Sequence, residues 1–209
     1  MNEHIPKTIY LIRHGETEYN KQGIIQGGTI DAGLNETGIL QARAFWNLYN
    51  DLKFEAVLTS RLKRTHQTVR HFLDAGIPWE QFAEINEMNW GAREGRPSTP
   101  ELIAEYEEIK ASWSSGSYDV RAHGGESASE LFQRVSIFVD HIRRRQENLL
   151  LVCSHGRAMS AMISAFLAEP LSEMNKYRHD NTGLWVLRYQ DETFRVVREN
   201  STDHLINLL

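Results

Sequence analysis

The sequence predicts an α/β fold with a largely parallel central sheet that is covered by helices on both faces. Short β-branched and aliphatic runs alternate with amphipathic helical patterns along most of the chain, which is the order that builds parallel sheets. The run from Leu149 to Cys153 is apolar throughout, as expected of a strand buried on both faces. Two strand patterns around an Asp191-Glu192 turn end the chain and add an antiparallel hairpin.

The N-terminal part combines strand and helix patterns around one long loop. Residues 8–12 form a short aliphatic strand pattern that ends against Arg-His-Gly. Residues 16–33 are rich in glycine and lack periodicity, so we expect a long loop with a functional role. Asn35 is the expected N-cap of the next helix. The remaining elements of this part are a strand at 56–59, a helix at 61–73 and a strand within 81–85.

Glycine, proline and serine clusters interrupt this alternation at about 91–125. We predict an insertion or lid there, built around a helix at 101–113. The elements expected after it are a helix at 128–145, the strand at 149–153, a helix ending near Leu167, and the strands 184–189 and 194–198. A length of 209 residues suits one domain with a sizeable core, so we predict a single domain over residues 1–209.

Composition narrows the class of protein. Apolar residues make up 41% and charged residues 24% of the chain, which is typical of soluble globular proteins. A formal net charge of -5 gives no general attraction to nucleic acid or to anionic membranes, so we expect neither as a partner. The single cysteine, Cys153, suits a reducing compartment. We find no signal-peptide pattern and no long apolar run, and we therefore expect a cytoplasmic protein.

Three polar fragments follow predicted strands and carry the chemistry. They are Arg13-His14-Gly15, Ser154-His155-Gly156 and the basic segment from Ser60 to Arg64. The carboxyl ends of parallel strands share one edge of a sheet, so these fragments are expected to meet there. Two histidines and two or more arginines in one pocket predict a phosphate site, because guanidinium groups match phosphoryl oxygens bidentately.

The chemistry of phosphoryl transfer assigns the roles in this pocket. The nucleophile needs a free lone pair, and neighbouring arginines keep a histidine neutral, so we predict His14 as the nucleophile, with a backbone carbonyl on its other ring nitrogen. Arg13, Arg64 and His155 are expected to neutralise the phosphoryl oxygens. Glu87 follows a predicted strand and is our candidate for the general acid and base.

No metal and no cofactor are expected. His66 and His71 are off the one-turn spacing that would aim both rings at a metal, and no cysteine or carboxylate cluster completes a site.

At this point the sequence resembles the histidine phosphatase superfamily, the phosphoglycerate mutase-like proteins. The segment LIRHGETEYN from Leu11 to Asn20 is similar to the family signature at nearly every position. The likeness spans essentially the whole chain and continues through Gln26-Gly27, Asp31, Leu34-Asn35, Gly38, residues 60–68, Glu87, Gly91, Glu94-Gly95, Gly125-Glu126-Ser127, Ser154-His155-Gly156 and Asn181-Thr182. The resemblance implies a three-layer α/β/α sandwich with a mostly parallel sheet.

The resemblance also implies the roles of individual residues. Those that match the family's catalytic set are Arg13, His14, Arg64, Glu87 and His155. Those that match residues around the phosphate are Thr17, Asn20, Gln26 and Gly156. Three positions depart from the family pattern and leave substrate specificity open, namely Ile24, Arg61 and His66.

Three functions compete at this stage. The leading hypothesis is a phosphatase of the histidine phosphatase class, acting on a small phosphorylated metabolite. The second is a cofactor-dependent phosphoglycerate mutase, but mutases of this family carry a longer, arginine-rich insertion, whereas residues 96–124 contain only Arg96 and Arg121. The third is a phosphate-binding domain without turnover. We expect the tryptophans to belong to the core or to the wall of the pocket, with Trp90 and Trp113 as the candidates for substrate contact. The sequence does not identify the natural substrate, and it is compatible with either a monomer or a homodimer.

Overall fold

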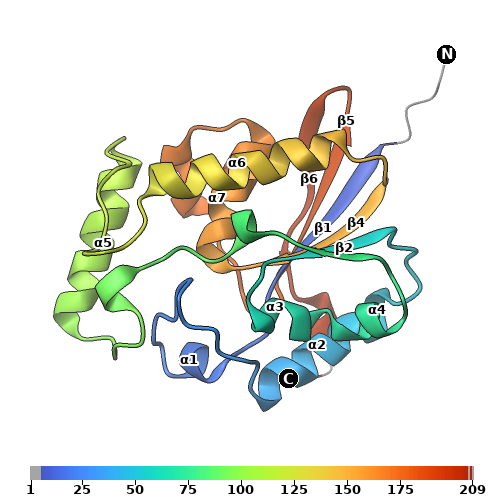
Figure 1. Cartoon of the computed structure of the whole chain (residues 1–209), viewed down its shortest axis with the longest axis horizontal. Coiled ribbons are helices and arrows are strands. Elements are labelled where there is room, and N and C mark those ends of the chain that lie inside the picture. The colour runs from blue at the N-terminus through green and yellow to red at the C-terminus, as the bar shows by residue number, and fades with distance from the viewer. Residues whose placement is uncertain (1–5, 207, 209) are drawn as a thin grey trace.

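The computed structural model describes residues 6–206 and residue 208, and it has the predicted α/β architecture (Figure 1). Residues 1–5, which belong to the stretch without a signal-peptide pattern, lie outside the described part, as do residues 207 and 209. One sheet has the strand order β3-β2-β4-β1-β5-β6. Its strands are β1 (Lys7–Arg13), β2 (Ala56–Thr59), β3 (Trp79–Gln81), β4 (Leu149–Ser154), β5 (Leu184–Gln190) and β6 (Thr193–Ser201).

The sheet is mostly parallel, as predicted. Strand β4 pairs in parallel with both β1 and β2, and β2 pairs in parallel with β3. The terminal hairpin supplies the antiparallel pairs β1–β5 and β5–β6. Its turn has positive φ angles of 50° at Asp191 and 62° at Glu192, the left-handed conformation that favours a tight hairpin.

Helices cover both faces of the sheet and form three layers (Figure 1). Helices α6 (Ala128–Arg144) and α7 (Gly156–Leu167) lie on one face, where Phe138 and Met162 join Leu11 and Leu58 of the strands in one core. The other face carries α2 (Glu36–Tyr49), α3 (Lys63–Thr68) and α4 (Arg70–Asp74). Alternate residues of the same strands point to opposite faces, so the sheet separates two apolar cores.

The helix predicted at 61–73 is two helices, because the chain leaves the helical path at Val69. The hydroxyl of Thr68 donates to the carbonyl of Arg64 at 2.7 Å and accepts from the amide of Gly15 at 2.9 Å. Such bonding to the carbonyl four residues back bends helices. At this break, the hydroxyl of Thr68 connects the end of α3 to Gly15, the residue that follows His14.

The strand predicted within 81–85 was placed too far along the chain. Strand β3 is Trp79–Gln81, paired with β2, and Ala83–Ile85 form a 3-10 helix. Ile85 is buried because it packs in the core beside α6, and its carbonyl accepts a hydrogen bond from Ser154 Oγ at 2.9 Å. The apolar character of a residue does not show whether it is buried in a strand or in a 3-10 helix that packs on the core.

The long loop after β1 and the segment at 91–125 each contain one α-helix. In the loop, α1 (Glu18–Lys21) starts in a capping box formed by Thr17 and Asn20. In the second segment, α5 (Pro100–Ser114) matches the predicted helix and lies at one end of the molecule (Figure 1). No helix in residues 6–206 is long and apolar enough to cross a membrane.

Candidate active site

The parallel strands β1 and β4 bring the two histidine fragments together at their carboxyl ends. Arg13 lies opposite Ser154 in the register, and the amide of His14 donates to the carbonyl of Ser154 at 3.0 Å. The ring centroids of His14 and His155 are 5.1 Å apart. The predicted meeting of these fragments at one edge of the sheet is therefore confirmed.

His14 is held as a neutral imidazole with one free nitrogen. Its side chain is 2% exposed, and its Nδ1 lies 2.7 Å from the carbonyl oxygen of Gly15. A carbonyl only accepts, so Nδ1 carries the proton and Nε2 keeps its lone pair. Burial lowers the pKa of His14 well below its usual value, and the charges of Arg64 and Arg13 lower it further. The predicted carbonyl contact is confirmed.

Arg64 is fully buried and fixed by three hydrogen bonds. Its Nη1 and Nη2 donate to the carbonyls of Ile30 and Gly27 at 2.9 and 2.8 Å, and its Nε donates to His155 Nδ1 at 3.1 Å. Burial lowers its pKa to about 10. The guanidinium therefore stays charged at neutral pH and lines the cavity next to His14.

Both ring nitrogens of His155 are engaged within the protein. Nδ1 accepts from Arg64, so Nε2 is the donor to Ser60 Oγ, 2.8 Å away. The pKa of His155 lies well below its usual value because of burial and the Arg64 charge. A direct contact between this ring and a phosphoryl group would require one of the two bonds to open, whereas its support of Arg64 is already formed.

Arg13 and Gly156 also line the cavity. Arg13 Nη1 donates to the carbonyl of His179 at 2.7 Å, and its buried Nε has no partner among the described residues. A Cβ at Gly156 would lie 3.8 Å from both Arg13 Nε and Glu87 Oε2. Any larger side chain at this position would therefore enter the space between Arg13 and Glu87.

The loop residues divide into one structural residue and two that line the cavity. Thr17 is buried, and its hydroxyl accepts from the amide of Asn20 at 3.2 Å and from Gln26 Nε2 at 3.0 Å. Asn20 and Gln26 both line the cavity, and the buried Oε1 of Gln26 has no partner among the described residues. Thr17 does not line the cavity itself, but its hydroxyl orients the side chains of Asn20 and Gln26.

Glu87 lies at the N-terminus of α7. Its Oε1 accepts from the amides of Met88 at 2.8 Å and Ala158 at 3.1 Å, and its Oε2 accepts from the amide of Arg157 at 3.2 Å. Three backbone amides thus fix both oxygens of the carboxyl group. This anchoring places the carboxyl group in the cavity that contains His14.

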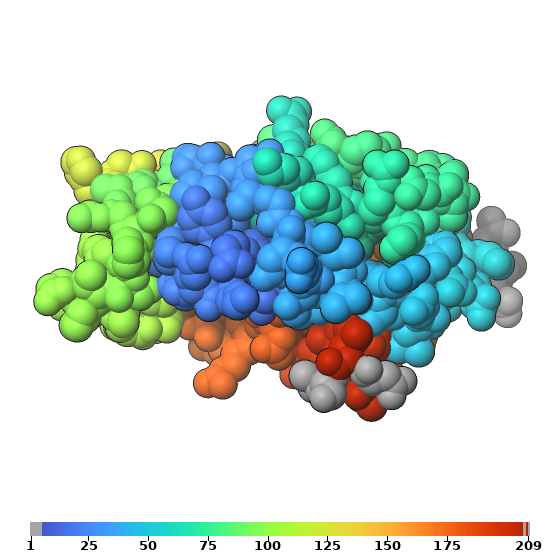
Figure 2. Space-filling view, turned by 90° about the horizontal axis from the view of Figure 1, so that it is seen from below, coloured from blue at the N-terminus to red at the C-terminus, as the bar shows by residue number. Residues whose placement is uncertain are grey.

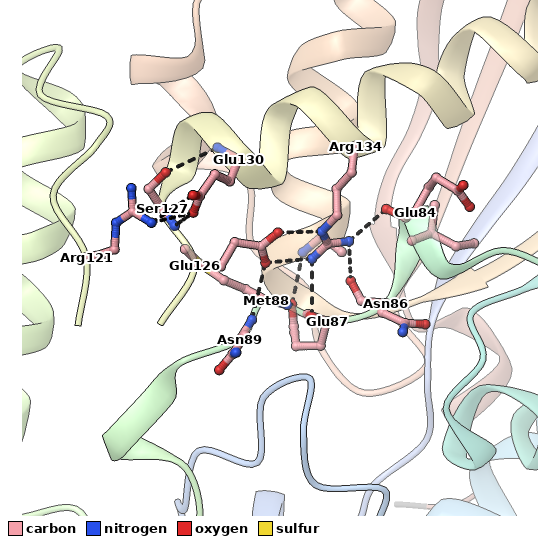
Figure 3. Close-up of polar contacts among 12 residues, drawn as sticks. Glu84, Asn86, Glu87, Met88, Asn89, Arg121, Glu126, Ser127, Glu130 and Arg134 are labelled. Atoms are coloured by element: carbon pink, nitrogen blue, oxygen red, sulfur yellow. Dashed lines mark hydrogen bonds and ion pairs between the residues drawn. The ribbon is translucent and has the colours of Figure 1, made fainter. Parts of the chain in front are cut away.

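Arg134 of α6 holds the segment that carries Glu87 (Figure 3). Its Nη1 donates to the carbonyls of Glu84 and Asn86 at 2.7 and 2.8 Å, and its Nη2 donates to that of Glu87 at 3.2 Å. Glu126 fixes the guanidinium with bonds of 2.6 and 2.9 Å. A half-buried ion pair thus sets the path of the backbone before the proposed acid.

Replacing Arg134 by methionine should therefore displace Glu87 without touching the cavity itself. We expect the free energy of unfolding to fall by about 2–4 kcal/mol, because the carbonyls and Glu126 lose their partner. We also expect kcat to fall by roughly tenfold, measured with an alkyl phosphate ester. Arg121→Met is the matched control, since Arg121 pairs with Glu130 on the surface. Equal losses of kcat in both variants would contradict the positioning role.

The cavity has a volume of about 660 Å³, and three further parts of the chain line it besides the fragments around His14, Arg64, Glu87 and Gly156. These are the loop around residues 20–27, helix α5 and residues 175–180, which adjoin one another on the face shown in Figure 2. Trp90 lines the cavity, whereas Trp113 is fully buried and donates to the carbonyl of Val120. Trp113 therefore belongs to the core, and its candidacy for substrate contact is wrong. No cluster of metal-ligating side chains occurs within the described residues.

Sequence reasoning missed several residues of this site. Asn181 Nδ2 donates to the carbonyl of His14 at 3.1 Å, and the carbonyl of His179 orients Arg13. The match of Asn181 to the family pattern could have identified it from the sequence. The carbonyl of His179 could not be identified in this way, because every residue has a backbone carbonyl. Arg157, which directly follows Gly156, and Tyr106 also line the cavity.

The fold and the paired histidines define a phosphoglycerate mutase-like protein. The chain belongs to the histidine phosphatase superfamily (branch 1), whose family model matches residues 9–202. The structure of the α-ribazole phosphatase from Shigella flexneri is similar, with a TM-score of 0.81 and 29% identity, covering 93% of this chain and 96% of that one.

Two curated relatives differ in how much of their length is matched. Phosphoserine phosphatase 1 of Hydrogenobacter thermophilus is 29% identical over 202 residues, which cover 94% of this chain and 93% of that protein. The 6-phosphofructo-2-kinase/fructose-2,6-bisphosphatase 3 of Rattus norvegicus is 37% identical over 177 residues, which cover 83% of this chain. The match spans only 30% of the rat protein's length.

Proposed function

We propose that this chain is a phosphoric monoester hydrolase that acts on a small phosphorylated metabolite through a phosphohistidine at His14. The state of His14 carries the proposal, because its free Nε2 shares a cavity with the guanidiniums of Arg13 and Arg64 and with the carboxyl group of Glu87. Phosphatase names among the relatives support the same reaction class. The superfamily match over residues 9–202 supports a single domain.

The reaction takes two steps. In the first, Nε2 of His14 attacks phosphorus, the ester P–O bond breaks, and protonated Glu87 gives its proton to the leaving alkoxide. In the second, Glu87 as a carboxylate takes a proton from water, the hydroxide attacks phosphorus, and the N–P bond breaks to release phosphate. Arg13 and Arg64 stabilise the charge on the phosphoryl oxygens in both transition states.

The mutase alternative requires that the phosphoryl group return to the substrate rather than to water. Arg96 and Arg121, the arginines of the segment 96–124, do not line the cavity, and Arg121 is paired with Glu130. Incubation with p-nitrophenyl phosphate, and with 3-phosphoglycerate plus a bisphosphoglycerate primer, separates the functions. We expect phosphate release in both reactions. Isomerisation without release would overturn the phosphatase proposal, and no reaction in either would favour a binding domain.

The role of Glu87 predicts a dependence on the leaving group. For Glu87→Gln we expect kcat/KM to fall by about 10²- to 10⁴-fold with an alkyl phosphate, whose leaving oxygen needs a proton. The loss should be much smaller with p-nitrophenyl phosphate, whose leaving group departs as a stable phenolate. Glu84→Gln is the control, because Glu84 does not line the cavity. Equal losses with both esters would exclude Glu87 as the general acid.

The location and the assembly remain predictions. Cys153 is a buried free thiol, which suits a reducing compartment and so supports a cytoplasmic location. A homodimer is the predicted alternative to a monomer.

A further inference from the structure

The cavity carries more positive charge than one phosphoryl group requires. Its wall contains two carboxylates, Glu87 and Asp180, and six cationic side chains, namely Arg13, Arg64, Arg93, Lys110, Arg157 and Arg178. Arg13 and Arg64 are adjacent to His14 and suffice for a dianionic phosphoryl group. Lys110 is paired with Glu107, whereas Arg157 has no ion pair among the described residues. Since buried or partly buried cations are costly without a counter-ion, this uncompensated charge points to a second anion.

Arg157 is oriented into this part of the cavity by neutral groups. Its Nη1 donates to Asn175 Oδ1 at 2.9 Å, and its Nη2 donates to the hydroxyl of Tyr106 at 2.6 Å. Asn175 is itself fixed by a bond from its Nδ2 to the carbonyl of Lys110 at 3.0 Å. A guanidinium has five N–H donors, so donors remain for a ligand. Among the described residues, no carboxylate forms an ion pair with the guanidinium of Arg157.

Arg93 also lines the cavity; it forms a long ion pair with Glu105 and donates from Nη2 to the carbonyl of Leu102, but its other donors are free among the described residues. Its side chain is 5% exposed, and its Nε and Nη1 have no hydrogen-bond partner within the described part of the chain. The nearest carboxylate oxygen, from Glu105, is 3.8 Å from Nη1, which is too long for a hydrogen bond. The guanidinium lies 5.3 Å from the ring centre of Tyr106, the residue that also orients Arg157.

The position of Arg157 in the chain limits the size of the ligand. The residue is next to Gly156, and its amide donates to the carboxylate of Glu87 at 3.2 Å. Its guanidinium is thus within one side-chain length of the proposed proton donor. A molecule that places its phosphoryl group at His14 reaches Arg157 with a short carbon skeleton.

We propose that Arg157 and Arg93 form an anion subsite, and that the substrate is a small phosphate monoester with a second anionic group, a carboxylate or another phosphoryl group. This inference rests on the phosphatase function proposed above. Arg157 would then determine specificity by contacting the part of the substrate that does not react. The competing explanation is that Arg157 only connects α7 to α5 and to the 3-10 helix Leu171–Lys176.

Competitive inhibition of p-nitrophenyl phosphate hydrolysis tests the subsite with two matched pairs of ligands. The first pair is 3-phosphoglycerate and glycerol 3-phosphate, which differ in a carboxylate. The second pair is fructose 1,6-bisphosphate and fructose 1-phosphate, which differ in a phosphoryl group. We expect the member with the second anion to have an inhibition constant about 10- to 100-fold lower in at least one pair, and that pair identifies the anion.

Variants of Arg157 complete the test. Arg157→Gln should remove the difference within the pair and Arg157→Lys should restore part of it, whereas Arg144→Gln, an exposed arginine outside the cavity, should keep it. Tyr106→Phe should weaken the same difference, and it replaces Arg157→Gln if that variant does not fold. Equal constants within both pairs for the parent, or equal loss for both members in Arg157→Gln, would overturn the subsite. Absence of His14-dependent hydrolysis would instead overturn the phosphatase function.

Discussion

Replacing His14 by alanine should lower kcat by roughly four to six orders of magnitude, the range seen when a covalent catalyst loses its nucleophile. The free Nε2 forms the bond to phosphorus, and His155 cannot replace it directly, since both of its ring nitrogens are engaged. Release of p-nitrophenol in single-turnover and steady-state assays measures the loss.

The matched control for this experiment is His71→Ala. His71 is a partly buried histidine on α4 outside the cavity, so its replacement should leave kcat close to that of the parent. Thermal unfolding of both variants separates loss of chemistry from loss of fold. A folded His14→Ala protein that retains even a tenth of the parent's kcat would remove His14 from the mechanism.

Replacing Arg64 by lysine should be the second most damaging change, even though the charge is kept. Lysine cannot reach Gly27, Ile30 and His155 at once, so buried acceptors lose their donor at a cost of about 1–3 kcal/mol each. We expect kcat/KM to fall by about 10²- to 10³-fold, as when one preorganised donor to a developing charge is removed. Kinetics and urea unfolding measure the two losses.

Arg61→Lys is the control for Arg64, because Arg61 is an exposed arginine just before the same helix. It should change neither kcat/KM nor the midpoint of unfolding measurably. Arg64→Lys with the parent's kcat/KM would show that charge alone suffices and that the orientation fixed by the three hydrogen bonds is not needed.

The fold and the centre of the site were predictable because they depend on local signals. The apolar run of β4 and the aliphatic run of β1 are unambiguous, and parallel pairing then brings His14 and His155 together. Capping residues such as Asn35 also mark helix starts correctly. The residues at the carboxyl ends of these strands can therefore be predicted from the sequence.

The rest of the site depends on tertiary packing that no local pattern encodes. Arg157, Tyr106 and Arg93 come from three separate elements, and only folding places them in one wall. The start of β3 and the break at Val69 were missed for the same reason, since a neighbouring strand and a threonine hydroxyl decide them. The burial of Trp113 shows that a tryptophan near a site can belong wholly to the core.

Rapid quenching with a ³²P-labelled phosphate ester tests the central claim most directly. The account predicts a transient label on the parent chain that is stable in alkali, labile in acid, located at His14 by peptide mapping, and missing from His14→Ala. A label on any other residue, or turnover by direct attack of water with inversion at phosphorus and no labelled chain, would contradict it.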